Sequence, residues 1–193
     1  MRSSLASKCV TCQGGDVEFA FVAGNLALDF VATIASRDTV AEEKLSTPTD
    51  LAEWLVLSGA VSKSSEISAE EFERAIGFRE TIYAALRDRI ATDTVDAGAL
   101  AAINSAAAGP TPVPVLSGGR VATYGTATAA IALVARAAQL ALTDPRLRFC
   151  AGAGCTRPFI DASRGGTRRW CGMSGCGDRA KAAAYRRRSS AKR

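Results

Sequence analysis

The chain has 193 residues, 48% of them hydrophobic, so it can hold one ordinary domain with a real core and a small appendage. It contains no histidine, which excludes Ser-His and Cys-His catalytic arrangements and any zinc site with histidine ligands. There is no run of about 18 uncharged apolar residues, and the first residues lack the apolar core of a signal peptide. We therefore expect a cytoplasmic protein that is neither inserted in a membrane nor an enzyme.

Charge is distributed unevenly along the chain. Residues 146–193 contain 13 Lys and Arg against 2 Asp and Glu, a net charge of +11. Residues 1–145 contain 11 Lys and Arg against 17 Asp and Glu, a net charge of −6. A polyanion would therefore bind the C-terminal part rather than the acidic body.

The N-terminal third begins without a clear apolar pattern, and residues 1–18 are predicted to be a flexible N-terminus. Phe19–Val22 has the composition of a short strand. Residues 26–37 then place apolar side chains at helical spacing, which predicts one helix over this range.

Further helices of the body are predicted from their first residues. Capping residues stand at Thr47, Ser68, Asp96 and Thr126, the first two in capping-box sequences. Between the last two helices, residues 109–125 hold two short apolar runs bracketed by Gly and Pro, which predicts a small hairpin at a sheet edge. The fold class is therefore mainly α with a small β element (α+β). Residues 19–145 form the helical body, which we expect to fold by itself.

Four of the six cysteines form the pattern C-x4-C-x15-C-x4-C: Cys150, Cys155, Cys171 and Cys176. Each close pair suits a turn that directs two thiolates at one metal, and the spacer suits a hairpin with strands at 158–161 and 168–170. A helix is expected directly after the fourth cysteine. This arrangement is treble-clef-like, and four thiolates favour one structural Zn²⁺. A pair of disulfides is the alternative, which a cytoplasmic chain disfavours.

Two cysteines remain outside this pattern. Cys9 and Cys12 are spaced as a redox pair or as half of a metal site, but no further cysteine pair is left to complete a second site. A segment with no defined role is the simpler interpretation, and the alternatives stay open.

The C-terminal motif resembles the CGNR zinc finger. The matching positions are Phe159, Asp161 and Ser163, the run Arg169-Trp170-Cys171, the run Cys176-Gly177-Asp178-Arg179, Lys181 and Arg186. The family's Asn is Asp178 here, and an ionised Asp cannot donate a hydrogen bond to a phosphate, so capping the helix is its expected role. The resemblance gives residues 146–188 as the finger and leaves 189–193 as a disordered tail.

The body is similar to the ABATE domain, which precedes this finger in bacterial stress-induced transcription regulators. The match rests on Leu28-Asp29-Phe30-Val31 and on the helix at Leu51–Leu55, whereas Ala32-Thr33 replaces the family's usual Asn-Thr. The resemblance implies a DNA-binding transcription regulator in the stress response.

The basic residues of the finger are the candidate nucleic-acid contacts. They are Arg168, Arg169, Arg179, Lys181, Arg186, Arg187 and Arg188. A basic helix after a metal site is a common way to contact phosphates. The alternative is that arginines close to the metal neutralise the thiolates, which fits Arg179 best and does not explain the residues further along the helix. RNA binding and a zinc-stabilised protein-interaction module also remain open, the former because Tyr185 could stack on a base.

The body is interpreted as a sensor or as a dimerisation domain. Asp29 and Arg37 lie eight residues apart and would share a face of the predicted helix, and Arg79 lies among apolar neighbours. These three residues are the candidate lining of a pocket for a small-molecule effector. A buried ion pair or a helix cap is the alternative, and a homodimer is the second candidate partner of the body.

Overall fold

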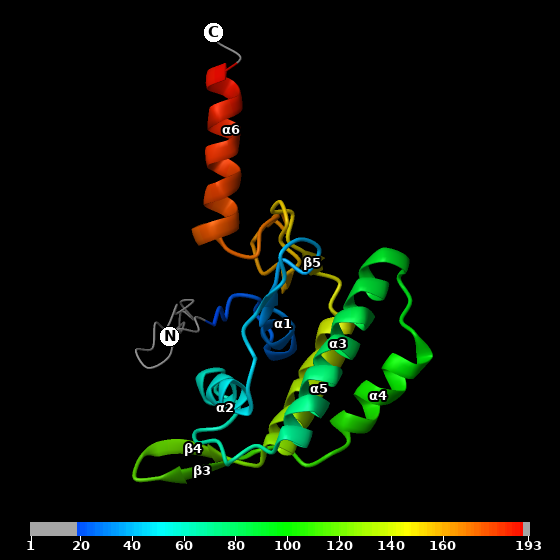
Figure 1. Ribbon diagram of the computed structural model, residues 1–193, viewed down its shortest axis with the longest axis vertical. Helices are drawn as coiled ribbons and strands as arrows, with labels where there is room; N and C mark the ends of the chain where they lie inside the picture. Colours follow the sequence, from blue (N-terminus) through cyan, green and yellow to red (C-terminus); the bar gives the residue numbers. More distant parts are fainter. Residues whose placement is uncertain (1–18, 191–193) are drawn as a thin grey trace.

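The computed structural model describes residues 19–190 and is mainly helical, with three separate two-stranded antiparallel sheets (Figure 1). The helices are α1 (Leu26–Val31), α2 (Pro48–Leu57), α3 (Ala69–Thr92), α4 (Ala97–Ala107), α5 (Ala127–Thr143) and α6 (Asp178–Ser190), with a kinked turn at Met173–Gly177 before α6. The strand pairs are β1 (Ile34–Ala35) with β2 (Glu42–Glu43), β3 (Val113–Ser117) with β4 (Arg120–Tyr124), and β5 (Leu147–Phe149) with β6 (Pro158–Ile160). The predicted fold class is confirmed.

Some predictions fall outside the described residues. The flexible N-terminus, with Cys9 and Cys12, lies in residues 1–18, and most of the predicted tail lies in 191–193. Ser189 and Ser190, which the sequence interpretation placed in that tail, form the last turn of α6.

The predicted helix starts are confirmed by their capping geometry. The Thr47 hydroxyl accepts the Asp50 N–H at 3.2 Å, and the Asp50 carboxylate accepts the Thr47 N–H at 2.8 Å. Ser68 and Glu71 make the same reciprocal pair at the start of α3. Asp96 and Thr126 cap α4 and α5. Because each cap satisfies backbone donors that the first turn leaves free, these helices begin where the sequence predicts.

The body packs around α3 and α5, which lie side by side, with α4 and α1 against them (Figure 1). α5 presents buried alanines at Ala130, Ala135 and Ala138, whose small side chains let neighbouring helices approach closely. Trp54 of α2 is 1% exposed, and the centroid of its ring lies 4.9 Å from that of the Phe30 ring in α1. This packing gives the body one continuous apolar core.

The predicted helix over residues 26–37 is wrong in its second half. α1 ends at Val31, and the Thr33 hydroxyl donates to the Phe30 carbonyl at 2.7 Å, which satisfies an acceptor at the helix end. Ile34 then pairs with Glu43 in the β1–β2 sheet. As a result, Asp29 and Arg37 do not lie on one face of a helix.

The predicted strand at Phe19–Val22 is also wrong. Instead of pairing with a strand, the N–H groups of Val22 and Ala23 donate to the Asp29 carboxylate at 3.0 and 2.9 Å. The segment is therefore held by a side chain of α1. The hairpin at 109–125 is confirmed as β3–β4, but it is a separate two-stranded sheet rather than the edge of a larger one.

The strands of the finger differ from the prediction. β6 pairs with β5, whereas 168–170 is not a strand, so the hairpin turn is the loop that carries Cys150 and Cys155. Residues 168–170 still lie against this hairpin, because the Ala151 N–H donates to the Arg169 carbonyl at 2.8 Å and the Arg168 N–H donates to Asp161 at 2.9 Å. Residues 168–170 are therefore held by one hydrogen bond to the Asp161 side chain and one backbone hydrogen bond, and not by the ladder of a strand.

Candidate metal centre and basic groove

The four predicted cysteines come together in the finger. The Sγ atoms of Cys150, Cys155, Cys171 and Cys176 all lie within 4.8 Å of one another. The Sγ atoms of Cys155 and Cys171 are 3.9 Å apart. Four sulfurs about 2.3 Å from a tetrahedral zinc ion would lie about 3.8 Å apart, so the donor set can hold one zinc ion once its wider pairs close by up to about 1 Å.

Local backbone geometry brings the first cysteine pair to this point. The chain reverses direction between β5 and β6 through residues 150–157. Within this turn the backbone of Gly152 lies close to the cysteine sulfurs. A Cβ atom at this position would lie 3.0 Å from the Cys176 Sγ and 3.4 Å from the Cys150 Sγ. Gly152 therefore leaves the space that the thiolates occupy, a requirement that the cysteine spacing alone does not reveal.

Hydrogen-bond donors surround the sulfurs and favour thiolates. The N–H groups of Gly152 and Cys171 donate to the Cys150 Sγ at 3.4 and 3.3 Å, and Arg179 donates to the Cys176 Sγ at 3.1 Å. Hydrogen bonds from the Cys155 and Cys171 thiols, followed by the backbone N–H groups of Cys171 and Gly152, lower the pKa of Cys150 well below its usual range. The hydrogen bond to Cys150, and to a smaller extent the negative charge of Cys150, raises the pKa of Cys155 to about 11. A divalent cation would offset this repulsion and replace the remaining protons.

The metal centre is attached to the body by several backbone contacts. The Ile160 N–H donates to the Ala23 carbonyl at 2.9 Å, and the Arg37 N–H donates to the Thr156 hydroxyl at 3.2 Å. Phe159 is fully buried and belongs to the same apolar cluster as the body helices. The cysteine loop and its hairpin are therefore part of the body's core rather than a separate small core.

Arg168, one of the predicted nucleic-acid contacts, lies inside this junction. Its guanidinium donates to the carbonyls of Val22, Trp170 and Cys171 and stacks 4.6 Å from the centroid of the Phe159 ring. These contacts tie the finger to the N-terminal segment and occupy the Nε and Nη2 donors of the guanidinium, the edge that would otherwise bind a phosphate in a bidentate manner.

The other predicted nucleic-acid residues are exposed. α6 has no buried residue and projects away from the rest of the molecule (Figure 1). A groove of about 710 Å³ lies between α6 and residues 151–153, with Trp170 in its wall. The cations lining it are Arg169, Arg179, Lys181, Arg186 and Arg187. Arg188 is exposed on the same helix and is not part of the groove lining.

Of the three residues predicted to line an effector pocket, the structure brings Arg37 and Arg79 together and separates Asp29 from them. Arg79 is 2% exposed and pairs with Glu43 at 2.6 Å and with Glu80 at 2.8 Å. Arg37 also pairs with Glu80. Asp29 lies apart from this cluster and binds backbone N–H groups, and its burial raises its pKa to about 6. The ion-pair and capping alternatives thus describe how these residues are placed, and no pattern in the sequence identified Glu43 or Glu80 as their partners.

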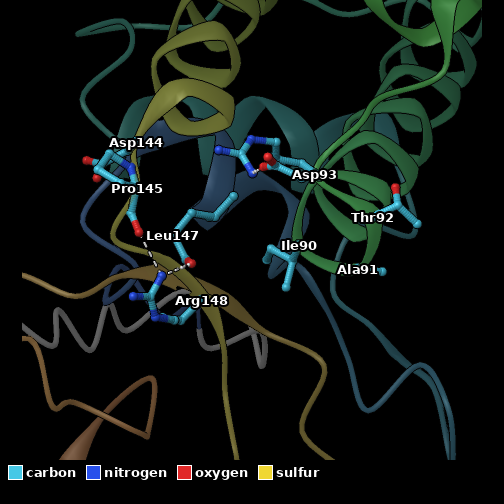
Figure 2. Close-up of a pocket in the computed structure, with 9 residues that line it drawn as sticks. Ile90, Ala91, Thr92, Asp93, Asp144, Pro145, Leu147 and Arg148 are labelled. Carbon is cyan, nitrogen blue, oxygen red and sulfur yellow. Dashed lines mark hydrogen bonds and ion pairs between the residues drawn. The ribbon is translucent and has the colours of Figure 1, made fainter.

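A different pocket lies at the C-terminal ends of α3 and α5, next to β5 (Figure 2). It has a volume of about 600 Å³. Its arginines are already engaged, since Arg89 donates to the Leu142 carbonyl at 3.0 Å and Arg148 donates to the carbonyls of Pro145 and Leu147. These contacts satisfy carbonyls at and beyond the end of α5.

The fold and the centre together define a zinc-finger protein with a helical body. Comparison with protein families gives the same two parts: residues 24–145 match the ABATE family model, described as "Putative stress-induced transcription regulator", and residues 146–189 match the CGNR zinc finger. The chain belongs to the ABATE family, and its finger has the donors for one structural zinc ion. Neither model describes an enzyme. No curated protein matches the chain. Within residues 19–190, no helix is both long enough and apolar enough to cross a membrane.

Proposed function

We propose that this protein is a DNA-binding transcription regulator that holds phosphates in the groove between the zinc centre and α6. The observation that supports it best is a helix that has no buried residue and carries five cations. A helix that is polar all round bridges to another unit, is stabilised by many internal ion pairs, or is not stable by itself. Within residues 178–190, the one ion pair is Lys181–Asp178, at 3.9 Å. A polyanionic partner is therefore the simplest reason for this helix.

The groove explains which part of the helix would meet the phosphates. Arg169 on the finger faces the same groove as Arg186 and Arg187 on α6, and no carboxylate lines it. Guanidinium groups bind phosphate oxygens in a bidentate manner. The zinc centre has the structural role of fixing the two walls, and Arg179, which contacts Cys176, connects it to the helix.

Binding of phosphates in this groove would contribute to the affinity for DNA more than to recognition of a base sequence. The cations of α6 point in several directions around the helix axis, and a phosphate-directed surface carries little sequence information. Asp178 in the first turn adds a negative charge at the end where a base contact would be expected. Selectivity for an operator would therefore come from DNA shape or from a partner.

The test measures binding of the zinc-loaded full chain to a labelled duplex across a salt series. Each phosphate contact contributes about 0.9 to the slope of log affinity against log salt. Arg186→Ala with Arg187→Ala should weaken binding to every sequence and reduce the slope by about 2. A charge-matched control is Arg120→Ala with Arg164→Ala, because both residues are exposed and lie outside the groove. The control should leave the slope near that of the wild type.

Three results would contradict the proposal in different ways. Equal weakening by both double variants would mean that net charge, not the groove, attracts DNA. Tight binding of single-stranded RNA without duplex binding would favour the RNA alternative, with Trp170 and Tyr185 as stacking candidates. No binding of any nucleic acid at low salt would favour a protein-interaction module. A small-molecule effector of the body stays a prediction.

A further inference from the structure

The four cysteines of the metal centre are not equally covered by the protein. Cys150, Cys171 and Cys176 are 7, 3 and 6% exposed, whereas Cys155 is only partly buried. Cys155 lies in the wall of a cavity of about 440 Å³ between residues 20–22, the β1–β2 sheet and the finger, and Cys171 and Cys176 line the same cavity from buried positions. A cavity of this size admits a small molecule, so a reagent in solution would reach the centre first at Cys155.

Hydrogen bonds to the sulfurs are also distributed unequally. Cys150 accepts two backbone N–H groups, and Cys176 accepts a guanidinium N–H at 3.1 Å. Within the described part of the chain, no N–H group reaches Cys171 with hydrogen-bond geometry, and at Cys155 the Arg157 N–H is only a weak donor. A hydrogen bond stabilises the charge of a thiolate and lowers its nucleophilicity. Cys155 and Cys171 are therefore the two more nucleophilic sulfurs of the centre.

The cavity surrounds Cys155 with more positive than negative charge. Lys44, Arg157 and Arg179 line it, and the one carboxylate in its wall, that of Glu42, is paired with Lys44. Neighbouring cations keep a partly exposed cysteine in its thiolate form, which is the form that oxidants attack. Cys155 thus has the surroundings of a reactive cysteine, whereas the other three sulfurs are buried.

We propose that Cys155 is the reactive thiolate of the centre, that small peroxides oxidise it, and that Cys171 resolves the product. The Cys155 thiolate attacks one oxygen of hydrogen peroxide and breaks the O–O bond, which gives a sulfenic acid and a hydroxide ion. The Cys171 thiolate, 3.9 Å away in the same wall, then displaces the second hydroxide and forms a disulfide. Two thiolates lose two electrons in total, and the peroxide becomes two hydroxide ions.

The disulfide and the metal exclude each other, because two of the four zinc ligands are used to form it. Oxidation should therefore release zinc. The proposal rests on the metal centre alone and not on the proposed binding of DNA.

The experiment adds an equimolar amount of hydrogen peroxide to the zinc-loaded full chain. Cys9→Ser and Cys12→Ser are introduced so that the four ligands are the only thiols present. A chromogenic chelator measures released zinc, which should appear as the disulfide forms and rebind after a thiol reductant is added. Zinc that stays bound in excess peroxide would overturn the proposal.

Mass spectrometry after tryptic digestion locates the disulfide. Trypsin leaves the first two ligands in one peptide, residues 149–164, and the last two in another, residues 170–179. A disulfide between Cys155 and Cys171 should join the two peptides, and fragmentation should assign it to these residues. A first product with Cys150 bonded to Cys155 would stay within one peptide and would overturn the assignment of the resolving cysteine. In a parallel reaction with limiting iodoacetamide, Cys155 should be alkylated at least about tenfold faster than Cys150, and equal rates would overturn the assignment of the reactive one.

Arg157→Gln tests the effect of the cavity without removing a ligand. The loss of this cation should slow peroxide-driven zinc release at least about threefold, because less positive charge would then favour the Cys155 thiolate. Arg164→Gln is the control, since it removes the same charge from an exposed position of the finger outside the cavity. It should release zinc at the rate of the parent chain. Equal rates in the two variants would show that the cavity does not determine the reactivity, contrary to the proposal.

Discussion

The finger contains two regions with opposite relations to the rest of the molecule: the zinc knuckle, residues 146–172, and helix α6. In the knuckle, Phe159 and Cys171 are 0 and 3% exposed and join the apolar cluster of the body. In α6, no residue is buried. The finger motif thus joins a segment whose residues are determined by packing to a segment whose residues are available to bind a partner. Metal and core stabilise the first region, and the second depends on helix propensity.

This difference bears on how the chain divides into parts. The family models meet at residues 145 and 146, as did the predicted boundary. In the structure the apolar cluster crosses that point, and Leu147, Phe159 and Ile160 pack with the body. The contrast between a core-bound knuckle and an unpacked helix can be tested by substitutions whose expected effects on stability differ widely.

The largest effect is expected from loss of the metal. Cys171→Ser should abolish zinc binding and lower the melting temperature of the whole chain in one transition, because the knuckle supplies part of the body's core. Structural zinc contributes about 10–16 kcal/mol of apparent binding free energy in small fingers, and a whole domain has a stability of about 5–15 kcal/mol. Metal analysis together with a thermal melt measures both results.

Cys12→Ser is the control, since it makes the same chemical change outside the four-cysteine cluster. It should retain one zinc ion and melt like the wild type. Normal zinc content in Cys171→Ser would exclude the four-thiolate assignment. Zinc loss with an unchanged body transition would mean that the knuckle is a separate unit, contrary to the shared core.

A smaller, pH-dependent effect is expected at Asp29. Its carboxylate holds the N–H groups of Val22 and Ala23, and the carbonyls of these residues accept bonds from Arg168 and Ile160 of the knuckle. Burial raises the pKa of Asp29 from 3.8 to about 6. A carboxyl whose folded pKa is raised stabilises the fold fully below the unfolded value, and this contribution is lost as the pH rises through the folded value.

Asp29→Asn should remove this dependence, because an amide oxygen accepts the same two bonds without a charge. The variant should gain stability relative to the wild type between about pH 4 and 6, by up to about 3 kcal/mol. Denaturant unfolding of both proteins at pH 4 and pH 7 measures the difference. A wild type whose stability rises relative to that of the variant as the pH rises would show that the carboxylate is stabilised by a positive charge, for which Arg157 is the candidate.

The sequence was informative where local rules decide the structure. Thr47 and Ser68 mark their helices because a cap acts within one turn, and the spacing of Cys150 and Cys155 marks the metal site because one turn brings two ligands together. Leu147–Phe149 gave no strand signal, since it is three residues long and pairs through contacts across the cysteine loop. The role of Arg168 was missed for a similar reason: its acceptor Val22 lies 146 residues away.

The smallest effect on stability is expected in α6. Ala184→Pro should break the helix locally, because proline lacks the N–H and clashes with the preceding turn, at a cost of about 3 kcal/mol. Since α6 has no buried residue, that cost should stay within the helix. Zinc content and the melting temperature should remain those of the wild type, with any change in unfolding free energy within about 0.5 kcal/mol. Circular dichroism would record the lost helix.

Ala138→Pro makes the same change in α5, where Ala138 is fully buried, and it should unfold the body. If the α6 variant instead melted early, like the α5 variant, the helix would have packing contacts that contradict its exposed placement. The α6 variant should also bind duplex DNA more weakly, because Arg186 and Arg187 leave the groove when the last turns unfold. Weaker binding at an unchanged melting temperature would separate the contact surface from the metal-supported core within one finger.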